Sequence, residues 1–238
     1  MITGAFLPVA KYVERCIDCG ICELYCPDYA ITIIRGGGEV RLEVRFAGFG
    51  GQGVITAGRL LALIVIEADP SLYVVYSPSY GFQTRGGDAL SDVIISDEEI
   101  DYPKARRLDL AFLLTQPAYN KYCGYVKDDG LIVIDDHVNK ADKTQCDVKR
   151  HRELSIITNA RLMGNDVFAS TIILGAAINY LSNTELLKGK LSLEQSKRVI
   201  TNYFRETLIG RRAGTEEIIS KNIKALEIGY KIMQELLT

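Results

Sequence analysis

The sequence predicts an α/β fold, a mostly parallel sheet with helices on both of its faces, preceded by a small and separate N-terminal segment. From about residue 40 onward, short strands rich in valine and isoleucine alternate with longer helical stretches, which is typical of such a sheet. The preceding residues contain four cysteines and end in Gly36-Gly37-Gly38, a break that neither a strand nor a helix favours. We therefore expect two parts, residues 1–38 and residues 39–238.

The pattern of apolar residues locates the elements of the larger part. Ser192 followed by Gln195 is a capping-box pattern that opens a helix. Apolar residues at three- and four-residue spacing mark a final amphipathic helix. The expected strands are 41–47, 73–76, 92–95, 108–114 and 131–134, and the expected helices are 54–68, 193–208 and a last one that includes 219–237.

The N-terminal cysteines follow the pattern C-x₂-C-x₂-C-x₃-C-P, which is typical of iron–sulfur clusters in bacterial ferredoxins. Structural zinc is the alternative, but a zinc ribbon needs a second C-x-x-C pair roughly 15–20 residues away, which this sequence lacks. A disulfide framework is disfavoured in so long a chain. We expect Cys123 and Cys146 to be ordinary thiols. The predicted [4Fe-4S] ligands are Cys16, Cys19, Cys22 and Cys26.

A single cysteine run leaves the fourth ligand open. In two-cluster ferredoxins the fourth cysteine of a run binds the other cluster, and here there is no second run. Cys26 could fold back onto its own cluster, or two chains could exchange Cys26 across a dimer interface. A thiolate from a partner subunit is the third possibility. We favour Cys26 in one of the first two roles.

Composition excludes several classes of protein. A net charge of −2 over 238 residues predicts neither a nucleic-acid-binding nor a membrane-surface protein. The densest apolar stretch, 60–66, is far shorter than the roughly 20 residues that cross a bilayer. The first ten residues have no basic leader or long apolar core. We therefore expect a cytoplasmic protein in a reducing setting.

A glycine-rich turn joins the first strand to the first long helix. Gly48, Gly50 and Gly53 satisfy G-x-G-x-x-G, which exposes backbone amides at a helix N-terminus where a phosphate is favoured. The version that binds NAD also needs an acidic residue at the end of the second strand, where this chain has Tyr76-Ser77-Pro78. We therefore do not expect NAD here. The alternative is that the glycines serve only close packing of helix against strand.

A second glycine-containing loop, 79–88, places Arg85 before Gly86 and Gly87. Such an arginine can donate two hydrogen bonds to an anion or to a partner backbone, although an incidental surface arginine fits the pattern equally well. The same two interpretations, functional group or solvated surface, apply to three further features. These are His137, which follows two aspartates at a strand end, and the basic clusters 149–152 and 211–212. None of these residues forms a recognisable catalytic set.

Three of these stretches together, 48–54, 80–87 and 91–103, resemble the gamma subunit of 2-oxoacid:ferredoxin oxidoreductases, most of all the 2-oxoglutarate branch. The resemblance covers about 39 to the C-terminus. It implies a Rossmann-like fold and a role in converting a 2-oxoacid and coenzyme A to an acyl-CoA and carbon dioxide, with reduction of ferredoxin. The alternatives within the family are pyruvate, branched-chain 2-oxoacids and indolepyruvate.

The resemblance also implies partners and sites. Thiamine diphosphate and Mg²⁺ belong to alpha and beta subunits, because this chain has no Gly-Asp-Gly followed by Asn-Asn. We expect a dimer of hetero-oligomers, ferredoxin as acceptor, and no catalytic residue in this chain. Coenzyme A is expected at a subunit interface. The residues expected to contact it or a partner are Gly48, Gly50, Gly51, Gln52, Gly53, Tyr80, Arg85, Gly86 and Gly87.

This sequence departs from the family pattern in two places. The family's separate ferredoxin subunit carries two cysteine runs, whereas here one run is fused to the gamma part. The loop also reads Phe82-Gln83-Thr84 where proline and glutamate are commoner at the first two positions. Two hypotheses from other classes remain, a stand-alone iron–sulfur dehydrogenase that binds NAD and a scaffold protein stabilised by zinc.

Overall fold

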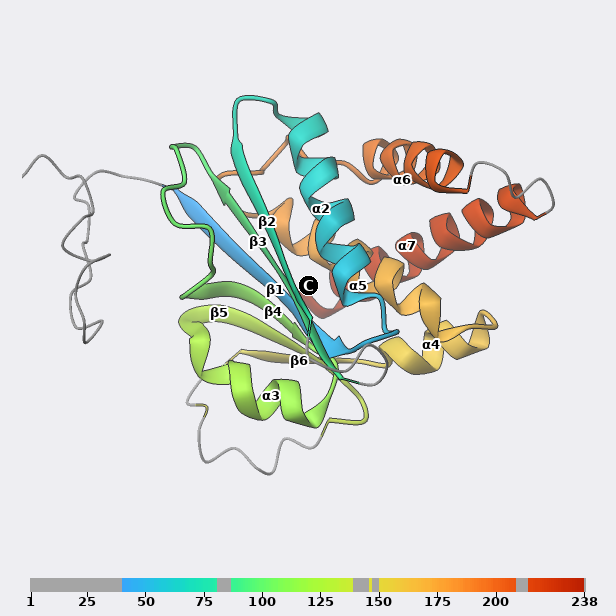
Figure 1. The fold of residues 1–238 in the computed structure, drawn as a ribbon, viewed down its shortest axis with the longest axis horizontal. Coiled ribbons are helices and arrows are strands. Elements are labelled where there is room, and N and C mark those ends of the chain that lie inside the picture. Colours follow the sequence, from blue (N-terminus) through green and yellow to red (C-terminus); the bar gives the residue numbers. More distant parts are fainter. Residues whose placement is uncertain (1–39, 81–86, 139–145, 147–149, 209–213, 238) are drawn as a thin grey trace, which may run out of the picture. The chain divides into compact units, whose positions relative to one another are not determined.

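A six-stranded sheet organises the part of the chain that the structure, a computed structural model, describes: residues 40–80, 87–138, 146, 150–208 and 214–237. The strand order is β2-β3-β1-β4-β5-β6 (Figure 1). The strands are β1 (Arg41–Phe49), β2 (Tyr73–Tyr80), β3 (Asp88–Ser96), β4 (Leu108–Leu113), β5 (Val126–Asp135) and β6 (His151–Leu154). The helices are α2 (Val54–Ala68), α3 (Gln116–Tyr122), α4 (Ile156–Leu162), α5 (Ala169–Leu181), α6 (Leu193–Thr207) and α7 (Thr215–Leu237), with short 3₁₀ turns at Cys123–Tyr125 and Asp166–Phe168.

The sheet is mixed, with a parallel majority. β1, β4, β5 and β6 pair in parallel, whereas β3 runs antiparallel between β1 and β2. Antiparallel neighbours such as β2 and β3 can be joined without a crossover connection. Each parallel pair requires a crossover connection. The predicted mostly parallel α/β sheet with helices on both faces is confirmed. The antiparallel insertion was not foreseen.

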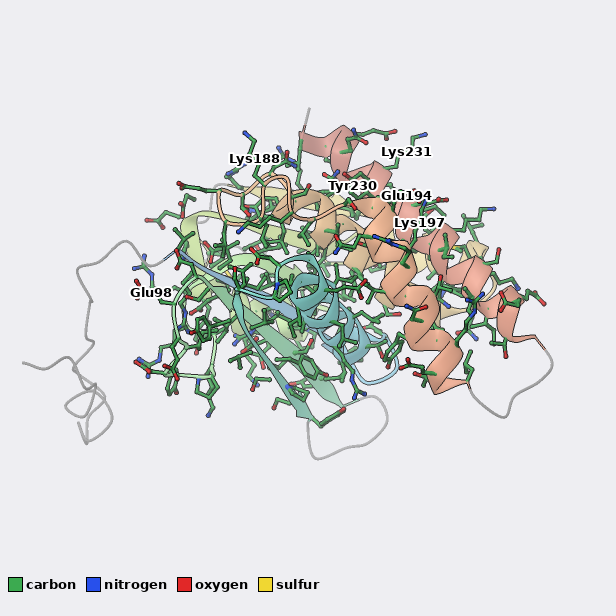
Figure 2. The ribbon with its side chains drawn as sticks, turned by 90° about the horizontal axis from the view of Figure 1, so that it is seen from above. Glu98, Lys188, Glu194, Lys197, Tyr230 and Lys231 are labelled. Carbon is green, nitrogen blue, oxygen red and sulfur yellow. A yellow bond between two sulfur atoms is a disulfide. The ribbon has the colours of Figure 1, made fainter. Side chains whose placement is uncertain are left out.

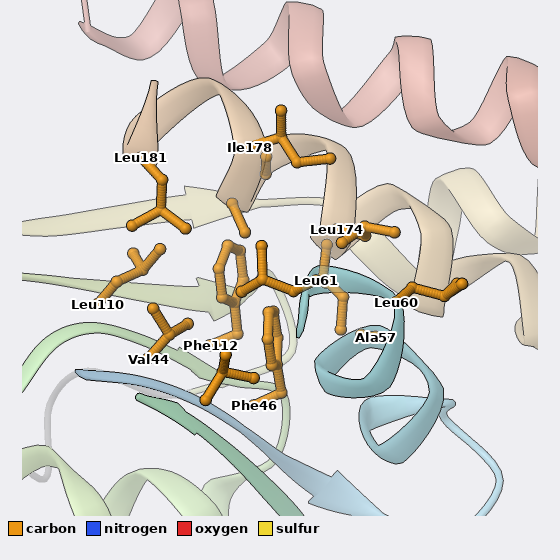
Figure 3. Close-up of a cluster of buried hydrophobic side chains, with 14 of the residues drawn as sticks. Val44, Phe46, Ala57, Leu60, Leu61, Leu110, Phe112, Leu174, Ile178 and Leu181 are labelled. Atoms are coloured by element: carbon orange, nitrogen blue, oxygen red, sulfur yellow. The ribbon is translucent and has the colours of Figure 1, made fainter. Parts of the chain in front are cut away.

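Alternate residues of the central strands face two separate hydrophobic layers, as the pleat of a strand requires. One layer contains Phe46 and Phe112, whose rings stack with centroids 5.1 Å apart, and it lies beneath α2 and α5 (Figure 3). The other contains Ala47 and Ala111 and lies beneath α3. Helices therefore cover both faces, with α6 and α7 added on the α5 side (Figure 1).

α6 and α7 are joined by charges at the surface. Lys197 of α6 lies 2.7 Å from Glu194 of its own helix and 2.7 Å from Glu227 of α7. Figure 2 shows Lys197 and Glu194 side by side on α6. The predicted cap of α6 is also present, since the Ser192 hydroxyl accepts a hydrogen bond from the amide of Gln195 at 3.2 Å.

Several local predictions needed correction. The strand β6 occupies 151–154, part of which we read as a basic surface cluster, because a short strand at the sheet edge needs few apolar residues. The short helices α3 and α4 were not predicted. Cys123 and Cys146, expected to be ordinary thiols, are joined by a disulfide with Cα atoms 5.8 Å apart, a pairing that sequence spacing does not reveal. None of the described helices is long and apolar enough to span a bilayer.

Candidate functional site

The glycine turn lies at the edge where the parallel strands end. β1 reaches this edge at Phe49, and the turn then leads into α2. The amide of Gly50 donates a hydrogen bond to the carbonyl of Gly87 at 2.8 Å. The structure therefore brings together two stretches, the turn and the end of the downstream loop, that the sequence analysis singled out separately. This edge is where ligands usually bind in open α/β sheets.

Steric limits explain why the turn needs glycine at its last position. Gly53 has a φ of +74°, a left-handed conformation that disfavours other residues. A Cβ atom at this position would also overlap the Cβ of Ser170, which lies in the first turn of α5. Gly51 has a φ of +107° but faces open space. Backbone shape and packing therefore account for these two glycines.

Gln52 stabilises the turn from within. Its side-chain oxygen accepts a hydrogen bond from the amide of Phe49 at 2.7 Å, which folds the carboxamide back over the turn. Gly53, the N-cap of α2, offers no side chain to bond the first amides of the helix. The positive end of a 15-residue helix therefore lies beside Gly51 and Gln52 without a side-chain cap.

The remaining predicted contact residues differ in how far the structure describes them. Tyr80 ends β2 with 72% of its surface exposed, and Gly87 is described through its contact with Gly50. Arg85 and Gly86 lie outside the described residues. β2 extends to Tyr80 and contains no carboxylate.

A compact acidic cluster follows β5 at the same edge. Asp135 is fully buried, and its carboxylate accepts a hydrogen bond from the amide of Ile157 in the first turn of α4 at 2.9 Å. His137 Nδ1 lies 2.7 Å from Asp135 and 2.5 Å from Asp136. These are atoms that can hold a metal ion, and they lie within 4.8 Å of one another. In this structure the three side chains bond to one another, and Asp135 also accepts a hydrogen bond from the start of α4. The cluster is therefore explained as a cap of that helix.

The two carboxylates change the titration of His137. The hydrogen bond from its ring to Asp135, together with the charges of Asp135 and Asp136, raises the pKa of His137 above its usual value. We expect the imidazole to titrate above pH 6.5, and we expect Asp136→Asn to lower that pKa. Because folding raises this pKa, any stabilisation is present below the unfolded value and is lost as pH rises through the folded value.

NMR titration of the imidazole carbon-bound protons measures this pKa. The chain has two histidines, so His137→Gln identifies which signal belongs to which ring. A His137 pKa at or below the ordinary value would show that the carboxylates do not hold the ring in solution.

A buried ion pair that was not predicted from the sequence lies on the α3 side of the sheet. Arg45 of β1 and Asp92 of β3 are 6% and 5% exposed, and two hydrogen bonds of 2.7 Å join them. Arg45 also lies 4.8 Å from the ring centre of Tyr122. Burial by itself would lower the pKa of Arg45, but the hydrogen bond and charge of Asp92 raise it. Asp92 thus keeps the guanidinium of Arg45 charged inside the fold, and the pair as a whole is neutral.

Known proteins identify the family of the chain. Residues 43–232 match the model of the pyruvate ferredoxin/flavodoxin oxidoreductases. The chain belongs to this family. Residues 9–32 match the model of the 4Fe-4S binding domain, and the two matched ranges do not overlap. These matches confirm the resemblance to 2-oxoacid:ferredoxin oxidoreductases that the three sequence stretches indicated.

Individual members of the family are similar to most of this chain. The 2-oxoglutarate synthase subunit KorC of Methanocaldococcus jannaschii is 33% identical over 202 residues, 83% of this chain and 97% of the relative. The ketoisovalerate oxidoreductase subunit VorA of Methanothermobacter thermautotrophicus is 29% identical over 197 residues, 83% of this chain and 37% of the relative. The solved gamma subunit of a keto/oxoacid ferredoxin oxidoreductase from Geobacter sulfurreducens has a TM-score of 0.59 and 29% identity, covering 81% of this chain and 95% of that one.

The cysteine run lies within the match to the 4Fe-4S binding domain and outside the described residues. The chemistry of the donors fits the group, because cysteine thiolates hold such clusters and this run follows the spacing found in bacterial ferredoxins. The match to the 4Fe-4S binding domain therefore supports a 4Fe-4S cluster in the N-terminal segment.

Proposed function

We propose that this chain is the gamma subunit of a 2-oxoacid:ferredoxin oxidoreductase, with an electron-transfer segment fused at its N-terminus. The enzyme converts a 2-oxoacid and coenzyme A to an acyl-CoA and carbon dioxide and reduces ferredoxin. The observation that carries this proposal is the family match over 43–232 next to a four-cysteine run in 9–32. The division of labour follows the boundary near residue 38, with 1–38 as the electron-transfer segment and 39–238 as the gamma part.

The electron-transfer role belongs to the cysteine segment. A [4Fe-4S] cluster supplies one-electron transfer. Cys16, Cys19 and Cys22 would hold it, together with Cys26 of the same chain or of a second copy. Such a cluster favours a cytoplasmic, reducing location, whereas the disulfide between Cys123 and Cys146 is a bond more common in oxidising compartments. The segment would pass electrons from the thiamine-containing subunits to external ferredoxin.

The gamma part would bind and position rather than catalyse. We propose that thiamine diphosphate and Mg²⁺ reside in alpha and beta subunits and that the complex is a dimer of hetero-oligomers. The glycine turn and the loop carrying Arg85 would contact coenzyme A or a partner subunit. Support comes from the 2.8 Å bond between Gly50 and Gly87 and from the helix N-terminus beside it that no side chain caps.

2-Oxoglutarate is our first choice of substrate. The relative that is 33% identical over 83% of this chain is named a 2-oxoglutarate synthase subunit. The second candidate is a branched-chain 2-oxoacid, because a ketoisovalerate oxidoreductase subunit is 29% identical over the same share of the chain. Identities of 33% and 29% are too close to decide between the two substrates. In this proposal the reacting carbon is held by other subunits, so the residues that select the substrate lie mainly outside this chain.

Anaerobic co-purification followed by a panel of 2-oxoacids tests the proposal. We expect the chain to co-purify with two thiamine-binding subunits and the complex to reduce ferredoxin only when coenzyme A is present. The kcat/KM for 2-oxoglutarate is expected to exceed that for ketoisovalerate and pyruvate by at least about tenfold, as a site with paired polar contacts discriminates. The complex assembled without this chain serves as the control.

Two outcomes would contradict these expectations. Preference for another 2-oxoacid would replace 2-oxoglutarate and leave the subunit role intact. Tight NADH binding by a chain that has no thiamine-binding partner would instead support a stand-alone dehydrogenase.

A further inference from the structure

A small polar cavity lies at the edge of the sheet opposite the glycine turn. β4 and β5 begin at this edge, at Leu108 and Val126, whereas the turn lies where β1 ends. The cavity has a volume of about 210 Å³. That is smaller than the roughly 300–1,000 Å³ of sites that enclose drug-sized ligands. It therefore suits a small ion, or the terminal group of a larger molecule.

Positive charge dominates the lining of this cavity. Arg106, Arg107 and Lys127 line it together with one carboxylate, Asp128. Lys127 is already bonded to Asp109 at 2.7 Å. The side chain of Arg107, in contrast, makes no hydrogen bond or ion pair with any other described residue. Its five donors are thus available to a ligand.

The backbone at Arg106 and Arg107 is held in place by a buried carboxylate. The carboxylate of Glu43, only 6% exposed, accepts hydrogen bonds from the amides of Arg106 at 2.6 Å and Arg107 at 2.8 Å. It also bonds the side chain of Arg41 at 2.8 Å. Glu43 therefore holds the two arginines at the cavity before any ligand arrives, which lowers the ordering cost of binding.

A second contact fixes the direction of the neighbouring arginine. The guanidinium of Arg106 lies 4.1 Å from the ring centre of Tyr102, so this cation is stacked at the cavity edge. Lys127 is held by its ion pair with Asp109. The cavity thus combines two oriented cations with one, Arg107, that has free donors.

We propose that this cavity is a binding site for an oxyanion of phosphate size. Arginine presents paired donors that match the geometry of phosphate oxygens, and charge-assisted hydrogen bonds are about twice as strong as neutral ones. Asp128 opposes the anion and limits its affinity. The site is separate from the proposed coenzyme A contact at the other edge of the sheet. Its occupant is free inorganic phosphate or the terminal phosphate of a phosphate ester.

Calorimetric titration of the full chain with inorganic phosphate tests the proposal, under anaerobic conditions in a phosphate-free buffer. We expect saturable binding at one site, and we expect Arg107→Gln to weaken it at least about tenfold because its donors are lost. Asp128→Asn removes the opposing charge and is expected to tighten binding severalfold. A gain of affinity cannot result from a damaged fold, so this variant keeps the test informative.

The matched control is Arg198→Gln. Arg198 lies on α6, outside the cavity, and is likewise exposed without a described partner. Its replacement is expected to leave phosphate affinity unchanged. Glycerol phosphate distinguishes the two sources: binding equal to that of inorganic phosphate identifies the terminal phosphate of an ester, and weaker binding identifies the free anion. Absent saturation, or equal affinity in the wild type and Arg107→Gln, would overturn the proposal.

Discussion

Arg45→Met is expected to lower the free energy of unfolding by about 3–5 kcal/mol, because the carboxylate of Asp92 would remain buried without its partner. Asp92 is 5% exposed and receives both of its 2.7 Å bonds from Arg45. The methionine side chain approximates the volume of the arginine stem, so little of the loss would come from a cavity. Denaturant unfolding of the wild type and the variant measures the difference.

Two further variants separate the ion pair from general damage. Arg45→Met combined with Asp92→Leu is expected to recover most of the loss, because apolar pairs often replace buried ion pairs without cost. Arg161→Met breaks an exposed pair with Asp166, 3.0 Å apart, and is expected to cost less than about 1 kcal/mol. A loss in Arg45→Met no larger than in Arg161→Met would show that water reaches Asp92.

Gly229→Ala is expected to destabilise the protein by at least about 2 kcal/mol, although alanine is the better helix former by about 1 kcal/mol. A Cβ atom on Gly229 of α7 would overlap the carbonyl of Ile172 in α5. A Cβ on Gly175 of α5 would likewise overlap the carbonyl of Leu226 in α7. The obstacles are backbone atoms, which cannot rotate away, so the two helices would have to move apart.

Thermal or denaturant unfolding measures this effect, and Ser220→Ala is the control. Ser220 is exposed on the same helix, so its replacement adds helix propensity without a close approach. We expect the control to change stability by less than about 0.5 kcal/mol. Unchanged or higher stability in Gly229→Ala would mean that the helices cross less closely in solution.

Much of the fold was predictable because its signals are local. The helix at 54–68 was predicted with the bounds that the structure gives, since a largely apolar stretch follows a glycine turn. The cap at Ser192 was predicted for the same reason, because a capping box involves neighbours in sequence. The strands other than β6 were located correctly, but most of them are longer than predicted, because pairing in a sheet extends a strand beyond its apolar centre.

The candidate site was predictable only in part. Sequence motifs picked out the glycine turn and the Arg85 loop, but only the fold brings Gly50 against Gly87. The disulfide between Cys123, directly after α3, and Cys146, beyond β5, likewise became apparent only from the fold. The residues proposed to contact coenzyme A remain a prediction.

The α/β class, the cysteine run and the family could be predicted from sequence alone, because each depends on patterns within a few residues of one another. The positions of the buried charges became known from the three-dimensional fold. Polar residues at alternate positions 41, 43 and 45 fit a solvent-facing strand, yet the structure buries Glu43 and Arg45 against partners 47 or more residues away. Burial depends on what the rest of the chain places over a strand, and no local pattern records that.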